Sequence, residues 1–323
     1  MNDKNDRNEN NKVFNSPDTA PAEDKSPTAP KDQDKNSAAG NEKKAELVNP
    51  NVKGRGKSFC ADIFVLYMVI GVIFSAIHTV ILKNGYDIEK HLTSYGSTSI
   101  AKAFYVIVAA IVLASCLIYP LTGVSKLTNK SFSKQKNLFL YAFCGFAVLA
   151  VTAFEFIIPS VSKVGNGTLI PVLFRISGIP FAAFFFSLIA KGKNAKKVQT
   201  VLGFFPIIWC VLKLICIYFD QTTPIGDPVK IMTQVTFVSV VCYFLAEQRV
   251  RIDKPMPRTF FVISNIAEFF LLFTAIPEVI LTFIGSWPAS SSTILVVMKL
   301  ALAGYIASRV LGLKKKKNPS KAK

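Results

Sequence analysis

The sequence lacks the short patterns that mark the common hydrolytic and nucleotide-dependent enzymes. It holds no H-E-x-x-H zinc motif, no G-x-S-x-G nucleophile motif and no G-x-x-x-x-G-K-[ST] phosphate-binding loop. These absences disfavour zinc and serine proteolysis and ATP hydrolysis by this chain. We therefore assign no catalytic residue. A lipid-modifying enzyme built from scattered polar side chains stays open as an alternative function.

Residues that bind metals are also scarce. The chain has two histidines, His78 and His91, and its six cysteines form no Cys-x-x-Cys pair. Zinc sites usually take Cys and His ligands at short, fixed spacings. We expect no metal and no cofactor, and we interpret the cysteines as small apolar packing residues.

Charged residues make up only 18% of the chain, against 51% hydrophobic residues. A soluble domain rarely has this composition. The formal net charge is +18, but no basic stripe with interleaved aromatic residues occurs outside the apolar stretches, so we expect no nucleic-acid partner. The excess of Lys and Arg lies mainly in connectors between apolar stretches, as in proteins that have the lipid bilayer as their main partner.

Large apolar side chains are almost missing from residues 1–57, which are rich in Asn, Asp, Lys, Ala, Pro and Ser. Such a segment cannot bury a core, and the first apolar stretch comes too late for a secretory signal peptide. We predict a disordered cytoplasmic tail at 1–57, a transmembrane domain at 58–313 and a short basic cytoplasmic tail at 314–323. The first tail is a candidate docking segment for a soluble protein.

Long apolar stretches recur along the predicted transmembrane domain. A hydrocarbon core of roughly 30 Å needs about 20 mostly apolar residues in helical form, and backbone groups in lipid must bond internally. We predict an all-α polytopic bundle of about eight spans. They lie near Phe59–Leu82, Ala101–Leu121, Leu138–Ile158, Leu169–Ala190, Val198–Phe219, Val229–Ala246, Thr259–Ile284 and Ser290–Leu313.

Two local signals predict where one span begins and which way the spans are oriented in the membrane. Asp227-Pro228 is a helix-start signal before the sixth span, because Asp can cap a helix and Pro suits the first helical position. Lys and Arg concentrate in alternate connectors, at 53–57, 126–136, 191–197, 249–258 and 314–317. By the positive-inside tendency both termini are cytoplasmic. We expect a plasma membrane, and the composition of the tails favours a bacterium.

We single out six ionisable side chains inside the predicted spans, where a charge costs roughly 2.5 to 3.5 kcal/mol. With the predicted orientation most of them lie in the outer half of the bilayer, and Glu268 lies near the midplane. Gln234 of the sixth span is expected to face the same region. The candidate ligand-binding residues are Arg175, Lys213, Glu155, Glu268, Glu278, Lys299 and Gln234.

Two interpretations of these charges stay open. In the first, a polar cavity binds a small charged or zwitterionic solute from the extracytoplasmic side, for transport or sensing. Arg175 and Lys213 would then be cationic contacts, and Glu155, Glu268 and Glu278 would balance charge or accept protons. In the second, the acids and bases pair across helices in a membrane scaffold. Salt-bridge distances favour the second interpretation, and an open polar pocket favours the first.

Overall fold

The computed structural model describes residues 52–87, 92–93, 99–118, 137–159, 164, 167–190, 193–220, 223–252, 254, 256–285 and 292–312. Most of both predicted tails lies outside these residues. Two short strands, β1 (Tyr86–Asp87) and β2 (Leu92–Thr93), pair antiparallel in the loop after the first helix. The helices are α1 (Val52–Gly85), α2 (Ser99–Ile118), α4 (Leu138–Ile157), α5 (Leu169–Ser187), α6 (Lys193–Leu202), α7 (Phe205–Tyr218), α8 (Pro228–Arg251), α9 (Pro257–Phe283) and α10 (Ser292–Leu311).

The expectation of an all-α, multi-pass membrane bundle is confirmed. Among the described residues, 7 helices are long and apolar enough to cross a membrane, with α6 and α7 counted together as one span. The remaining predicted span corresponds to α2, whose apolar segment Ala103–Leu117 is shorter. The start signal of α8 is also confirmed, because the Asp227 side chain accepts a hydrogen bond of 2.9 Å from the Val229 N–H.

The predicted start of the first span is confirmed, because the apolar span begins at Cys60, although helix α1 itself begins at Val52. Two other predicted spans are corrected. The fifth span is divided at Gly203–Phe204 into α6 and α7, with Pro206 in the first turn of α7. The sixth span continues past Ala246 to Arg251, because the charges in its last turns are neutralised inside the bundle rather than in a polar connector.

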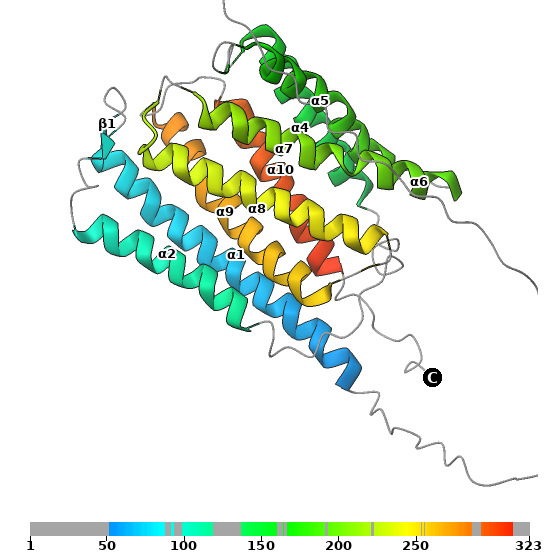
Figure 1. Cartoon of the computed structure of the whole chain (residues 1–323). Helices are drawn as coiled ribbons and strands as arrows, with labels where there is room; N and C mark the ends of the chain where they lie inside the picture. Colours follow the sequence, from blue (N-terminus) through cyan, green and yellow to red (C-terminus); the bar gives the residue numbers. More distant parts are fainter. Residues whose placement is uncertain are drawn as a thin grey trace, which may run out of the picture. The chain divides into compact units, whose positions relative to one another are not determined.

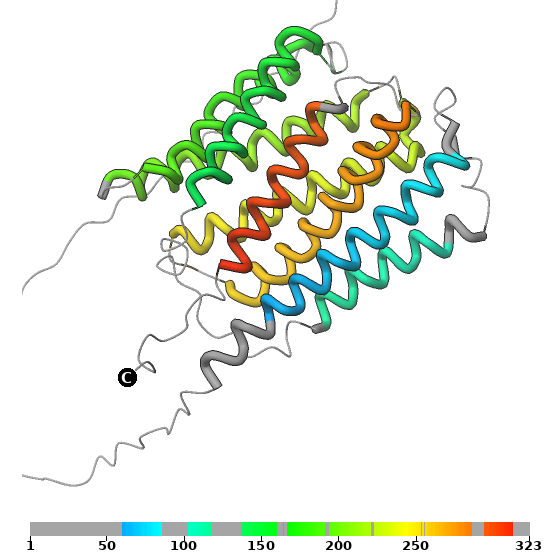
Figure 2. The backbone as a smooth tube through the Cα atoms, turned by 180° about the vertical axis from the view of Figure 1, so that it is seen from behind, coloured from blue at the N-terminus to red at the C-terminus, as the bar shows by residue number. Residues whose placement is uncertain are grey.

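Six helices form a closed circuit of contacts, which we call the helix ring. In order, α4 packs against α5, α5 against α7, α7 against α8, α8 against α9, α9 against α10, and α10 against α4. Outside the ring, α1 packs along α9, and α2 makes a smaller contact with α9 (Figure 1). The helices run side by side along a common direction when seen from the opposite side (Figure 2).

Aromatic side chains fill the interior of the helix ring. Phe181 of α5 lies 5.5 Å from Trp209 of α7 and 6.0 Å from Phe244 of α8, measured between ring centroids. Phe185 of α5 and Phe244 both contact Tyr305 of α10, at 5.2 and 6.3 Å. All five side chains are buried. Aromatic rings bury large apolar areas and pair favourably at these separations, so they close the space that six helices would otherwise enclose.

Small residues let α4 and α5 approach closely. A side chain at Gly178 of α5 would overlap Thr152 of α4. A side chain at Gly145 of α4 would overlap the ring of Phe186 of α5. Small residues allow dense van der Waals packing between helices in lipid, where the hydrophobic effect between helices is weak.

Candidate functional site

The helix ring carries charges at both ends, which we call the basic end and the opposite end. At the basic end, exposed cations include Lys196, Lys197, Arg249 and Lys254. Helices α5, α8 and α10 finish there, whereas α4, α7 and α9 finish at the opposite end. Most of the candidate residues named from the sequence lie toward the opposite end.

The first candidate pair joins α7 to α4. The Lys213 ammonium Nζ lies 3.2 Å from the Glu155 carboxylate Oε1, and both side chains are buried. The same ammonium lies 4.9 Å from the ring centroid of Phe174 of α5. Cation and ring at this distance attract each other, so the Lys213 charge is held between a carboxylate and an aromatic face.

Arg175 of α5 belongs to the same region. It is partly exposed and lies one residue after Phe174. The Phe174 ring contacts the Lys213 ammonium, so Arg175 directly follows a residue that borders the first pair. Three neighbouring helices of the ring carry Arg175, Lys213 and Glu155 in one region, and we call these residues the three-charge cluster.

The second candidate pair joins α10 to α9. The Lys299 ammonium donates hydrogen bonds to both carboxylate oxygens of Glu278, at 2.7 and 2.8 Å. Glu278 also lines a small cavity between α1, α8 and α9, together with His78, Thr233 and Thr274. The two groups are within salt-bridge distance, which favours a structural role for the pair. The carboxylate of Glu278 nevertheless borders the cavity.

Two predicted residues are not brought into either group. Glu268 lies in the middle of α9, is 1% exposed, and forms no ion pair with the described residues. Gln234 of α8 is partly exposed and does not line the cavity beside Glu278. The predicted set is thus split into one cluster, one pair and two separate residues.

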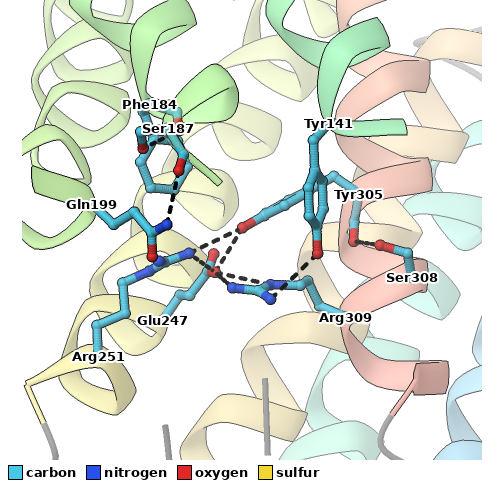
Figure 3. Close-up of polar contacts among 9 residues, drawn as sticks. All are labelled: Tyr141, Phe184, Ser187, Gln199, Glu247, Arg251, Tyr305, Ser308 and Arg309. Atoms are coloured by element: carbon cyan, nitrogen blue, oxygen red, sulfur yellow. Dashed lines mark hydrogen bonds and ion pairs between the residues drawn. The ribbon is translucent and has the colours of Figure 1, made fainter. Parts of the chain in front are cut away.

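Sequence reasoning missed a buried ionic network at the basic end, shown in Figure 3. The Glu247 oxygen Oε1 accepts hydrogen bonds from Arg251 Nη2 at 2.6 Å, from Arg309 Nη2 at 2.6 Å and from Arg309 Nε at 3.1 Å. It also accepts the Tyr305 hydroxyl at 2.6 Å. Arg309 further donates to the Tyr141 hydroxyl at 3.5 Å. We call these five residues the Glu247 network.

The network connects three helices of the ring and contacts a fourth. Glu247 and Arg251 come from α8, Tyr305 and Arg309 from α10, and Tyr141 from α4. The Arg251 guanidinium lies 5.0 Å from the ring centroid of Phe184 of α5. Glu247 is 0% exposed, so one carboxylate oxygen concentrates four donors in a dry environment.

Signals for this network were present in the sequence. Arg309 lies inside the predicted eighth span, where a cation is costly and calls for a partner. Glu247 and Arg251 are spaced i and i+4, which places them on one face of a helix. The predicted sixth span ends at Ala246, which places Arg251 in a connector. The Glu247–Arg251 pair is therefore not recognised as part of a membrane helix.

The described residues contain no group of His, Cys, Asp and Glu that could hold a metal ion. Their cysteines are free thiols. Comparison with family models, curated proteins and solved structures finds no match for this chain. The function is therefore inferred from the residues of the chain itself.

Proposed function

We propose that this multi-pass membrane protein binds a small zwitterionic solute from the extracytoplasmic side, for transport or sensing. The proposal includes the orientation inferred from the Lys and Arg pattern, with the basic end in the cytoplasm of a bacterial cell and the opposite end facing outward. The observation that supports it is the buried Lys213–Glu155 pair, which lies against Phe174, the residue before Arg175 on the adjacent helix α5.

The three-charge cluster has the composition that such a solute needs. Guanidinium and ammonium groups recognise a carboxylate, and a carboxylate recognises an ammonium group. Glu155 and Lys213 are already bonded to each other, so a zwitterion would exchange this internal pair for two pairs of its own. The exchange leaves neither side chain without a partner of opposite charge, because a zwitterion supplies one charge of each sign.

Access beyond the cluster requires rearrangement. The ring interior is filled by side chains such as Trp209 and Tyr305, and the Glu247 network joins α4, α8 and α10 at the basic end. In a transporter this is the expected form of a conformation sealed toward the cytoplasm. Passage would then require parting of the network as helices move against one another.

Ligand-dependent thermal stabilisation tests the proposal. Purified wild-type protein would be screened against a panel of amino acids and betaines, and the compound giving the largest increase in Tm would be tested on variants. Arg175→Gln is expected to abolish the increase in Tm, because the carboxylate of the ligand loses its contact with the guanidinium group. Lys299→Gln is the matched control, since it breaks the other ion pair toward the same end and should retain the increase.

Two results would contradict the proposal. One is an unchanged ligand-dependent increase in Arg175→Gln. The other is equal loss in both variants, which would indicate that general destabilisation, rather than a lost contact, removes binding.

The alternative is a membrane scaffold in which the ion pairs only fix helix packing. It is favoured by the closed geometry of Glu155 with Lys213 and of Glu278 with Lys299. Exchanging the charges, in Glu155→Lys combined with Lys213→Glu, distinguishes the two. A scaffold keeps near wild-type stability and assembly after the exchange, whereas a stereospecific binding site loses its ligand.

A further inference from the structure

We propose that Glu268 is a proton-binding site within the membrane, holding an exchangeable proton in the sealed conformation. The carboxyl group lies in α9, the helix that contacts α1, α2, α8 and α10. Its side chain is 1% exposed, and within the described part of the chain its oxygen Oε2 has no hydrogen-bond partner. The inference stands independently of the solute proposed above.

The buried cations on α8 and α10 are bound to other groups, and Lys230 of α8 donates to the backbone carbonyls of Asp220 and Thr223. On α10, Lys299 donates to both oxygens of Glu278, and Arg309 donates to Glu247. On α8, Arg251 also donates to Glu247. None of these contacts supplies a positive charge to Glu268.

The tyrosines and the histidine on the surrounding helices give no counter-charge. On α1, the Tyr67 hydroxyl donates to the Ile111 carbonyl of α2, and His78 lies 3.5 Å from the Phe273 carbonyl. Tyr305 of α10 donates to Glu247. Tyr105 of α2 and Tyr243 of α8 carry uncharged hydroxyl groups.

An ionised carboxylate in this setting would be a buried charge without a counter-charge, which is among the most unfavourable arrangements in a protein. The neutral acid removes that cost. Release moves the proton from the carboxyl oxygen to a water molecule and leaves the carboxylate, so release requires water or a cation to reach the middle of α9. Proton exchange is thereby linked to opening of the bundle.

Glu247 provides a matched control of opposite character. Both acids are buried, at 1% exposure for Glu268 and 0% for Glu247. Glu247 accepts hydrogen bonds from two guanidinium groups and a phenol, and these bonds favour the ionised form of its carboxyl group. The two acids therefore share burial and differ in their partners, so replacing each with glutamine separates protonation from burial.

Infrared spectroscopy of the full-length protein in lipid tests the proposal. At neutral pH the wild-type protein should show a carbonyl band of a protonated carboxyl group that shifts when water is replaced by D₂O. The band should be lost in Glu268→Gln and kept in Glu247→Gln. Protein labelled with ¹³C-glutamate gives a test without any substitution, because the band must then move by the isotope shift.

Three results would overturn the proposal. The first is a protonated-carboxyl band that persists in Glu268→Gln. The second is the absence of this band from the labelled wild-type protein at neutral pH. The third is failure of Glu268→Gln to fold, because glutamine closely imitates the neutral acid and should be tolerated. Solute binding retained in Arg175→Gln would contradict the proposed function and would leave all three measurements unaffected, so the two proposals fail separately.

Discussion

Replacing Glu247 with glutamine should be among the most destabilising single changes available in this chain. The substitution keeps the shape of the side chain and removes only its charge. It leaves the guanidinium groups of Arg251 and Arg309 without the carboxylate that they share at 2.6 Å. The perturbation therefore isolates the electrostatic contribution of the Glu247 network.

The magnitude follows from what remains after the change. Removing one partner of a buried ion pair costs about 3–5 kcal/mol, mainly because the other charge stays buried. Adding about 1.5–3 kcal/mol for each of the four hydrogen bonds to the charged oxygen would overshoot, since the bonds share one acceptor. We expect a loss of about 3–5 kcal/mol, a large part of the total stability of a typical protein.

The partners of Glu247 should rank by the bonds that they make. Arg309→Gln removes two hydrogen bonds to Oε1, and Arg251→Gln removes one. Tyr305→Phe removes a single bond of 2.6 Å to the carboxylate, about 1.5–3 kcal/mol. The expected order of destabilisation is therefore Glu247→Gln or Arg309→Gln first, then Arg251→Gln and Tyr305→Phe.

Equilibrium unfolding in mixed micelles measures these effects, and a double-mutant cycle between Glu247 and Arg309 measures their coupling. Glu268→Gln is the control, because it replaces an equally buried acid outside the network. A change below about 1 kcal/mol in Glu247→Gln, or a coupling energy near zero, would refute the reasoning, since neither fits a buried pair with strong mutual attraction.

Two further predictions concern packing and orientation. Gly178→Ala should destabilise the contact of α4 with α5, because the added methyl group overlaps Thr152, and adding Thr152→Ala should recover much of the loss in thermal unfolding. Recovery would be absent if the overlap were not the cause. For orientation, a membrane-impermeant maleimide should label Asn84→Cys in intact cells, whereas Asn194→Cys should react only after permeabilisation. Both positions are exposed in the structure, and the reverse pattern would invert the topology.

The span prediction succeeded because lipid imposes a simple rule on the sequence. Backbone groups must bond within each helix, so length and hydropathy are enough to place α4, α5, α9 and α10 within a few residues. The rule fails where polar groups satisfy one another inside the bundle. It ended the sixth span at Ala246 although α8 continues to Arg251, because single-residue hydropathy counts a buried ion pair as two solvated charges.

The sequence indicates how deep each charged residue lies in the membrane, but it does not indicate which neighbouring helix the residue faces. The sequence placed Glu155, Arg175 and Lys213 at similar depth, and the structure pairs Glu155 with Lys213 against Phe174, the residue before Arg175. Depth separated Glu268, near the midplane, from Glu278, but it could not show that Glu278 meets Lys299 while Glu268 meets no cation among the described residues. Which acid finds a base depends on which helices are neighbours in the ring.

By itself the sequence determined the class of fold, the approximate spans and the list of charges that need an explanation. These follow from local composition, because the bilayer acts on each helix separately. The tertiary structure decided which charges are neighbours, how the Glu247 network joins α4, α8 and α10, and why Glu268 stands apart. Those properties depend on side-chain geometry between helices that are distant in sequence, and local composition does not specify which helices become neighbours.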